Sequence, residues 1–462
     1  MERPHQLLQT ETYNKAYVIW ISLIVSMGGL LFGYDLGVIT GVIPFIQQQY
    51  SLDGFNLGWV VAIFELGCMA GAFVVSPITE RFGRKKALIL TAILFILTTL
   101  GIVLADSAKT LALWRSLQGV TVGAASVLSP MYISEISPRT IRGKLISINQ
   151  LMIIFGILLA TFISYKFGDP AKIDSWRIMF GFALLPSGLF LVLLFSIPET
   201  PRWLLNMGMK LKAEKVLSRF GNENYVSLEL IAMQTSMTSK TQGSFRELFS
   251  KDMLPLLQLG IVLAVLQQFC GSNNVTAYLQ VIFQKAHIDI KDGLLNAVFV
   301  GLVFFSFTVL AIFLVDRIGR KKLMLTGTLL MAAFLFSLAL TFNSDQVNGK
   351  LVFIFIMGFI ATYAFTLAPV TWVVLAEIFP NRLRSKGMSV ASASLWLSCF
   401  LVVLVSPYLL KLSPVINFSL FGLLNISGYV FVLKRLPETK GKSLEEIEDY
   451  LLKESGQVKR KG

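Results

Sequence analysis

The chain has 462 residues, of which 55% are hydrophobic and 15% are charged, and its mean hydropathy is +0.69. A soluble protein of this length carries about 25% charged residues, so the composition argues against a soluble protein. The formal charge of +14 comes from Lys and Arg residues that gather in alternate loops between apolar segments. That is the positive-inside pattern of membrane proteins. We prefer this explanation of the positive charge to a nucleic-acid-binding surface.

Twelve apolar segments follow one another along the chain, each close to the ~20 residues that cross a bilayer as a helix. Loops rich in Lys and Arg follow the second, fourth, sixth, eighth and tenth segments, so we expect both termini in the cytoplasm. The twelve segments are centred roughly on residues 17–44, 56–78, 87–105, 110–134, 144–166, 178–197, 255–283, 293–315, 321–342, 350–376, 387–409 and 414–434.

A polar stretch between the sixth and seventh segments divides the chain into two halves. Within it, residues 211–220 place apolar side chains at helical spacing and predict a short amphipathic helix. In the C-terminal tail, Ser443 and Glu446 have the spacing of a capping box, which predicts another helix. The predicted organisation is a cytoplasmic tail (1–16), a six-helix bundle (17–197), a cytoplasmic helical linker (198–253), a second six-helix bundle (254–436), and a cytoplasmic helix and tail (437–462).

The second half of the chain repeats motifs of the first. The basic loop at 80–86 (ERFGRKK) reappears at 316–322 (DRIGRKK), and the Pro-Glu-Thr of 198–200 reappears at 437–439. Two repeated halves in a membrane protein predict a secondary transporter, whose bundles rock about a site between them. Pro130, Gly271 and Pro369 mark places where helices could bend.

Charged residues recur in the repeated loops and next to them. Gly83 and Gly319 predict tight turns. Ion pairs among the charges would hold the halves together on the cytoplasmic side when that side is closed, and would break when it opens. The alternative is that the charges only set the topology; acids at repeated positions favour the gate. The predicted gate residues are Glu80, Arg81, Glu135, Arg142, Glu199, Arg317, Glu377, Arg384 and Glu438.

Six short motifs are spread along the chain: GGLLFGYD at 28–35, the loop at 80–86, RSLQG at 115–119, PETPRWL at 198–204, QQF at 267–269 and PETKG at 437–441. In this order and spacing they resemble the sugar porter family of the major facilitator superfamily nearly from end to end. Within that family the chain is similar both to the bacterial xylose–proton symporters and to the glucose facilitators. The resemblance implies an all-α major facilitator fold of twelve transmembrane helices in two pseudo-symmetric bundles.

Ionisable residues inside the apolar segments point to coupling. Asp35 lies midway along the first segment, and Arg115 begins the fourth. A charge at the bilayer centre costs roughly 2.5–3.5 kcal/mol, so it is rarely present without a role. The resemblance implies that Asp35 carries a proton and that Arg115 tunes it; the alternative is a static ion pair. For Glu65, in the second segment, three roles stay open: a second proton site, a competing partner for Arg115, or a residue of the outer vestibule.

Amide side chains gather in the seventh segment. An amide both donates and accepts hydrogen bonds without bringing a charge into the membrane, so it suits sugar hydroxyls; the alternative is bonding between helices. Ala277 and Leu395 stand where similar family members have a tyrosine and an amide, and Ile157 stands where the xylose symporters have glutamine and several glucose carriers have isoleucine. These differences predict a less polar pocket and make a hexose at least as good a candidate as xylose. By resemblance, the sugar contacts are Phe32, Gln150, Gln267, Gln268, Asn273, Trp372 and Trp396.

We therefore predict a proton-coupled symporter of a hexose or pentose, with sugar, proton and membrane lipid as its partners. We expect a monomer in a bacterial inner membrane, with no enzymatic activity and no cofactor, metal or nucleic acid. The alternatives are a facilitative sugar carrier in which Asp35 is structural, a sugar sensor that barely transports, and a porter of inositol or an organic anion. The three cysteines stand singly in apolar segments, which predicts core packing rather than disulfides or metal ligands.

Overall fold

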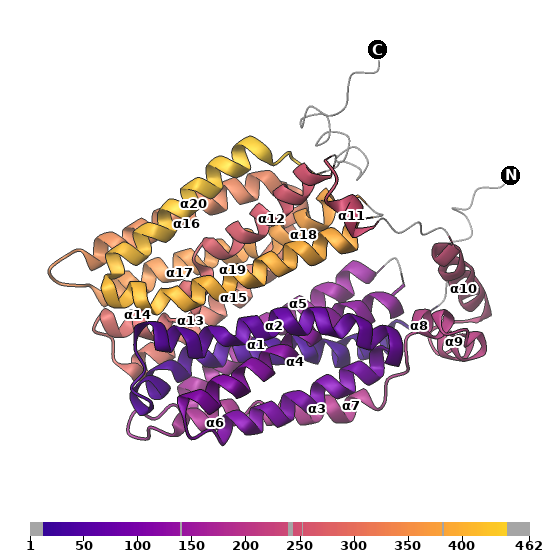
Figure 1. Cartoon of the computed structure of the whole chain (residues 1–462), viewed down its shortest axis with the longest axis horizontal. Helices are drawn as coiled ribbons and strands as arrows, with labels where there is room; N and C mark the ends of the chain where they lie inside the picture. The colour runs from indigo at the N-terminus through magenta and orange to yellow at the C-terminus, as the bar shows by residue number, and fades with distance from the viewer. Residues whose placement is uncertain (1–12, 139–140, 239–243, 252, 381–382, 441–462) are drawn as a thin grey trace, which may run out of the picture.

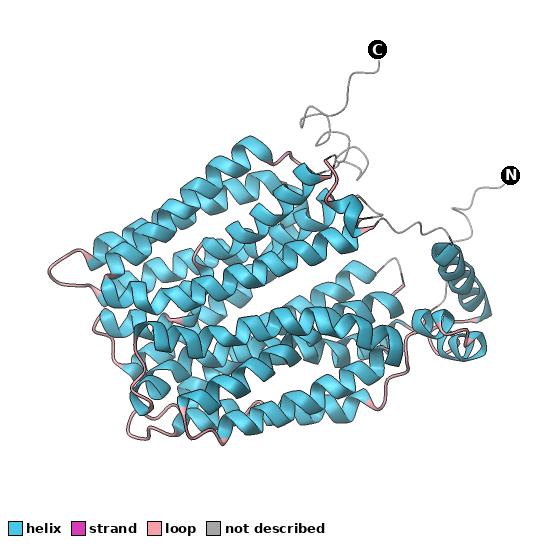
Figure 2. Ribbon diagram, viewed as in Figure 1, coloured by secondary structure: helices cyan, strands magenta, loops and turns pink. Residues whose placement is uncertain are grey.

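The structure is a computed structural model that describes residues 13–138, 141–238, 244–251, 253–380 and 383–440. Over these residues it is helical, apart from one isolated β-bridge between Tyr13 and Gly221. Figure 2 shows the helices joined by short loops. The helix predicted at the Ser443 capping box lies outside the described residues.

Within the described residues, eleven helical segments are long and apolar enough to cross a membrane. The remaining span is α4 (Ala108–Ile136), 29 residues long, whose Arg115 and Gln118 lower its mean hydropathy. The first half of the chain contains α1 (Lys15–Gln49), α2 (Gly54–Phe82), α3 (Arg84–Val103), α4, α5 (Arg142–Phe167), and the sixth span, α6 (Ser175–Gly181) with α7 (Leu184–Leu194).

Four short helices connect the two halves: α8 (Pro201–Asn206), α9 (Lys210–Leu217), α10 (Glu223–Thr238) and α11 (Phe245–Leu248). The amphipathic helix predicted at 211–220 corresponds to α9, whose Ala213 and Leu217 are buried. The second half contains the seventh span, α12 (Leu254–Phe269) with α13 (Ser272–Ala277) and α14 (Leu279–Lys285), then α15 (Ile290–Ile318), α16 (Arg320–Phe342), the tenth span, α17 (Gly349–Phe365) with α18 (Leu367–Ile378), α19 (Arg384–Leu412) and α20 (Pro414–Arg435).

The helix breaks follow the predicted positions in two of three places. The seventh span breaks at Gly271, which has φ +89°, a region that favours glycine. The tenth span breaks at Thr366, three residues before Pro369. Pro130, in contrast, lies inside a continuous α4, so the helix does not break there. Where a span breaks, some backbone N–H and C=O groups are not bonded within the helix. These polar groups can then face a cavity.

The two halves lie side by side, with α1–α7 in one and α12–α20 in the other (Figure 1). We call the end that carries the turns at Gly83 and Gly319, together with α8–α11, the basic-loop end. Both turns have positive φ, +94° and +106°, as expected of tight turns at glycine. At the opposite end the halves are joined: Lys411 forms an ion pair with Asp53, and the Thr40 hydroxyl donates to the Thr276 carbonyl at 2.8 Å.

Close backbone contact between α1 and α5 sets the shape of the first half. Gly29, Gly33, Gly37 and Gly41 recur at every fourth position of α1, and each faces α5. Small residues at this spacing let two membrane helices approach closely, so van der Waals contact replaces the missing hydrophobic driving force. Gly33 is the tightest of these positions: a Cβ atom there would lie 1.7 Å from the carbonyl oxygen of Ile153.

Gly33→Ala is therefore expected to destabilise the protein by about 3 kcal/mol or more, since neither backbone can move aside without separating α1 from α5. The measurement is the apparent melting temperature of the purified variant in detergent. Gly188→Ala, in α7, is the matched control, because no atom lies within 4 Å of a Cβ at that position. Equal melting temperatures for the two variants would contradict the close contact.

Candidate functional site

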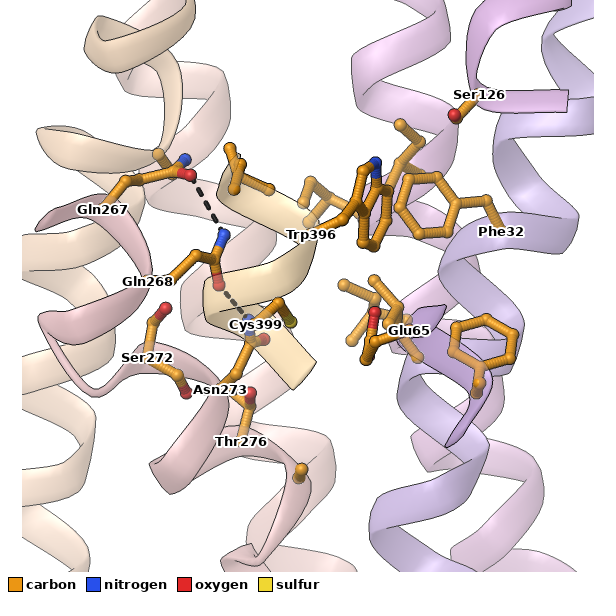
Figure 3. A pocket seen from close by; sticks show the side chains of 18 of the residues that line it. Phe32, Glu65, Ser126, Gln267, Gln268, Ser272, Asn273, Thr276, Trp396 and Cys399 are labelled. Carbon is orange, nitrogen blue, oxygen red and sulfur yellow. Dashed lines mark hydrogen bonds between the residues drawn. The ribbon is translucent and has the colours of Figure 1, made fainter. Parts of the chain in front are cut away.

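A cavity of about 620 Å³ lies between the two halves, within the size range of small-molecule sites. Side chains from α1, α2, α4 and α5 line it on one side, and side chains from α12, α13, α15, α17, α18 and α19 line it on the other. Figure 3 shows part of this lining from close by. The cavity brings together all seven residues expected to contact sugar: Phe32, Gln150, Gln267, Gln268, Asn273, Trp372 and Trp396.

A chain of amides forms one wall of the cavity. Gln268 Nε2 donates to Gln267 Oε1 at 3.1 Å, and Asn273 Nδ2 donates to Gln268 Oε1 (Figure 3). Gln267 and Gln268 end α12 and Asn273 begins α13, so the break at Gly271 turns all three toward the same space. Bonds among the amides offset part of their desolvation cost and leave other donors and acceptors for a ligand.

Asn274, the next residue, faces away from the cavity. Its Nδ2 donates to the Ser406 hydroxyl at 2.8 Å and to Asn417 Oδ1 at 2.7 Å. It therefore joins α13 to α19 and α20, which is the interhelical role left open for the amides of this segment. Neighbouring residues of the short helix α13 thus have different roles: Asn273 faces the cavity, and Asn274 bonds to other helices.

Aromatic side chains of both halves meet at the cavity. The rings of Phe32 in α1 and Trp396 in α19 have centroids 6.0 Å apart, so the two halves touch here. Trp372 in α18 also lines the cavity and is 39% exposed. Gln150 in α5 supplies an amide on the side of the first half. A flat apolar ring beside amides suits a sugar, which has both an apolar face and hydroxyl groups.

Asp35 and Arg115 form an ion pair inside the first half. Arg115 Nη1 donates to both carboxylate oxygens of Asp35, at 2.8 and 2.6 Å, and each side chain is 2% exposed. The guanidinium lies 4.4 Å from the ring centroid of Phe64, and Gln118 accepts a further bond at 3.3 Å. Arg115 itself lines the cavity, so the pair connects the cavity wall of α4 with α1.

Glu65 also lines the cavity, from α2 (Figure 3). The residue is 5% exposed, and its Oε2 atom has no hydrogen-bond partner among the described residues. The carboxyl lies beside the thiol of Cys399 in α19. Glu65 therefore lies at the central cavity, and not in an outer vestibule, which was one of the three roles considered for it.

Charged residues form one cluster at the basic-loop end of the first half. Arg84 Nη2 donates to Glu135 Oε1 at 2.9 Å, and the Thr200 hydroxyl donates to Glu135 Oε2 at 2.6 Å. The backbone N–H groups of Arg84 and Lys85, at the start of α3, donate to the Glu199 carboxylate at 3.0–3.2 Å. Burial raises the pKa of Glu199 above its usual range, although backbone N–H donors act against it.

The second half builds the same cluster from the repeated residues. Arg320 Nη2 donates to Glu377 Oε1 at 3.0 Å, and the Thr439 hydroxyl donates to Glu377 Oε2 at 2.6 Å. The backbone N–H of Arg320, at the start of α16, donates to Glu438 Oε1 at 2.9 Å. Three bonds thus recur at repeated residues: arginine Nη2 to glutamate, threonine hydroxyl to the same glutamate, and the arginine backbone N–H to the second glutamate.

The ion pairs of both clusters lie within one half each, and not between the halves. Each basic loop offers two arginines for such pairs, and the ones that form them are Arg84 and Arg320 rather than Arg81 and Arg317. The sequence feature that distinguishes these two arginines is that each directly follows the turn glycine. That position places each of them in the first turn of a helix, α3 or α16, where the side chain faces inward. Arg81 is exposed and lies over the Phe82 ring at 5.3 Å.

The other predicted gate residues are arranged differently. The Glu80 side chain is exposed, and its backbone carbonyl accepts a bond from Trp203. Arg317 is exposed, and its carbonyl accepts from Lys440. Arg142 Nη2 donates to the Ser137 carbonyl at 3.1 Å. Among the described residues, Arg142 Nε and both Nε and Nη2 of Arg384 have no hydrogen-bond partner.

Comparison with known proteins gives a family for this arrangement. The family model described as "Sugar (and other) transporter" matches residues 21–451. The arabinose-proton symporter of Bacillus subtilis (strain 168) is 35% identical over 453 residues, covering 96% of this chain and 97% of the relative. The D-xylose-proton symporter of Escherichia coli (strain K12) is 34% identical over 474 residues, covering 94% and 96%.

Among solved structures, the partially occluded, inward-open conformation of the xylose transporter XylE from E. coli matches with a TM-score of 0.83 at 32% identity. The match covers 93% of this chain and 100% of that one. The predicted fold, an all-α membrane protein of two six-helix bundles, is confirmed by this match. The relatives are transporters and not enzymes.

Proposed function

The chain belongs to the family of sugar and other transporters, and on that premise we propose that it is a proton-coupled symporter of a pentose or hexose. The observation that carries this proposal is one cavity that combines a wall of paired amides with an arginine bound to a buried aspartate. The first feature suits a sugar and the second a proton. The names of the two relatives, both proton symporters of pentoses, support the same reading.

Sugar binding would use the seven residues of the cavity. Gln267, Gln268 and Asn273 offer donors and acceptors from the second half, and Gln150 offers an amide from the first. Sugar hydroxyls would replace some of the bonds that the amides make with one another, so that buried polar groups stay paired in both states. The aromatic rings would cover the apolar face of the sugar and exclude water.

Proton coupling would use Asp35 and Arg115. When Asp35 takes up a proton, it loses the charge that holds Arg115, and a buried cation without its partner is costly. Arg115 is then free to take a new position at the wall of the sugar cavity. A change at the cavity would in turn alter how readily Asp35 keeps its proton, because the two sites share Arg115. That reciprocity is the basis of the proposed symport.

Alternating access would move residues 17–197 against residues 254–436, with 198–253 as the linker between them. The halves touch at the opposite end, and each charged cluster at the basic-loop end is closed within its own half, which fits a state open at the basic-loop end. Positive charge in those loops would place that end, and both termini, in the cytoplasm. Arg142 Nε and Arg384 Nε and Nη2 have no hydrogen-bond partner within the described part of the chain, and they would pair when that end closes.

The test is transport by the purified protein in liposomes. A panel of D-xylose, L-arabinose, D-glucose, D-galactose and myo-inositol is offered with an inward proton gradient and an inside-negative potential. We expect one sugar to accumulate above its outside concentration, and the accumulation to collapse when a protonophore is added. Equilibration without accumulation would instead indicate a facilitative carrier, and no movement of any solute would overturn the sugar assignment. We further propose a monomer, surrounded by lipid, in a bacterial inner membrane.

A further inference from the structure

Glu65 is the one carboxyl among the described residues that line the cavity, and neither the amide site nor the proton pair uses it. It is 5% exposed, and its Oε2 atom is buried without a hydrogen-bond partner among the described residues. An acceptor buried in this way costs free energy unless something else bonds to it. The carboxyl faces the cavity, so a ligand in the cavity is the partner within its reach (Figure 3).

The charged and titratable groups around Glu65 do not account for it. Arg115 faces it from α4, but Arg115 Nη1 donates to both oxygens of Asp35, and no ion pair joins it to Glu65 in the described part of the chain. Asp35 in α1 has the same charge and repels it. Cys68 on its own helix and Cys399 on α19 are thiols, which are weak donors. Glu65 is therefore not half of a structural ion pair.

The position of Glu65 completes a line of polar groups across the cavity. On the far wall, Asn273 Nδ2 bonds to Gln268 and lies 3.0 Å from Cys399 Sγ. Cys399 in turn lies beside Glu65. The line thus runs from the amides of the second half to a carboxyl of the first half (Figure 3). A molecule with several hydroxyls can bond to both of its ends at once.

We infer that Glu65 binds a hydroxyl of the transported sugar, opposite the amides of α12 and α13, and so helps to select the sugar. This inference rests on the proposed function. A carboxylate is a stronger acceptor than an amide, and it fixes the orientation of the hydroxyl that donates to it. A sugar held by Glu65 on one side and Gln268 and Asn273 on the other would also tie the two halves together around it.

The test compares Glu65→Leu and Glu65→Gln with the wild type by calorimetric titration of D-xylose, L-arabinose and D-glucose and of their monodeoxy derivatives. For the sugar that binds best, Glu65→Leu should weaken binding about tenfold to a hundredfold, and Glu65→Gln should weaken it less. In the wild type, one deoxy derivative should bind about tenfold more weakly than its parent sugar. In Glu65→Leu, that derivative and its parent should bind equally, because the lost hydroxyl has no partner left.

Two controls keep the result from reflecting misfolding. Asp345→Leu removes an exposed acid from the loop after α16 and should bind sugar as the wild type does. Removing a buried carboxyl that has an unbonded oxygen among the described residues should leave the melting temperature unchanged or raise it, because binding groups are held at a cost to stability. A large fall in melting temperature of Glu65→Leu, with unchanged affinity for the parent sugars, would indicate a structural role and overturn the inference.

The remaining outcomes separate this inference from the proposed function. If the wild type transports a sugar and Glu65→Leu binds every derivative as the wild type does, the inference alone is overturned. If Glu65→Gln keeps the affinity and the derivative pattern but loses proton-driven accumulation, Glu65 carries a proton instead, and the inference is again overturned. If the wild type neither binds nor transports any sugar of the panel, the proposed function falls, and this inference falls with it.

Discussion

Asp35→Asn is expected to abolish proton-driven sugar accumulation while leaving sugar exchange in place. Asparagine has the shape of aspartate but cannot take up a proton, so sugar and proton movement should separate. A potential of ~100 mV contributes about 2.3 kcal/mol per charge, enough for roughly fifty-fold accumulation with one proton per sugar. The variant should fall from that level to equal concentrations on both sides. Counterflow of labelled sugar without a gradient should continue.

The measurement is uptake and counterflow in liposomes, with wild type and variant reconstituted in parallel. Asp35→Asn leaves Arg115 without its counter-ion, and breaking a buried pair costs about 3–5 kcal/mol, so folded protein must be quantified first. Asp345→Asn, in the exposed loop after α16, serves as the control for loss of an acid and should accumulate sugar normally. Undiminished accumulation by Asp35→Asn would make the Asp35–Arg115 pair structural and would remove the basis for coupling through it.

Glu135→Ala should destabilise the protein more than Glu377→Ala, although each residue accepts a bond from an arginine Nη2 and one from a threonine hydroxyl. Glu135 also accepts a bond from Arg84 Nε at 3.2 Å. The Arg84 and Glu135 side chains are 10% and 7% exposed, whereas those of Arg320 and Glu377 are 12% and 21% exposed. Removing Glu135 leaves a buried guanidinium without its partner, which costs about 3 kcal/mol. Water reaches the second pair more readily, so its loss should cost about 1 kcal/mol.

The readout is the apparent melting temperature of each purified variant in detergent. The double variant Arg84→Gln/Glu135→Ala should recover part of the loss, because the uncompensated charge is then gone. The repeated halves thus provide their own internal control. Equal shifts for the two single variants would mean that these pairs contribute through their geometry and not through their burial.

Several features could be predicted from the sequence because they depend only on the order of the residues along the chain. The length of each apolar run predicts a span, since a helix needs a set number of residues to cross the hydrocarbon. The repeated motifs indicate two related halves, and the structure builds them as the same bonds around Glu135 and Glu377. The sugar-contacting residues implied by resemblance all line one cavity. Their roles remain predictions.

Pairing could not be predicted in the same way, because it depends on how each helix is rotated and how closely it lies to its neighbours. The basic loops contain several arginines each, and only the structure selects Arg84 and Arg320 as the partners of the acids. Hydropathy does not distinguish Asn273 from Asn274, yet the break at Gly271 turns one toward the cavity and the other toward α19 and α20. For the same reason, the sequence could not predict where the Glu65 side chain points.

The sequence by itself thus determined that this protein spans the membrane, that its two halves are related, and which buried charges and amides are available for chemistry. Those properties follow from composition and order, because burying an apolar run or a charge in lipid has much the same cost wherever its neighbours lie. Only the tertiary structure decided which charges pair within a half, which amide faces the cavity, and that Glu65 Oε2 is buried there without a hydrogen-bond partner among the described residues. Those properties depend on contacts between helices far apart in the chain. Rotating a helix by one residue position moves a side chain from the cavity to a helix interface.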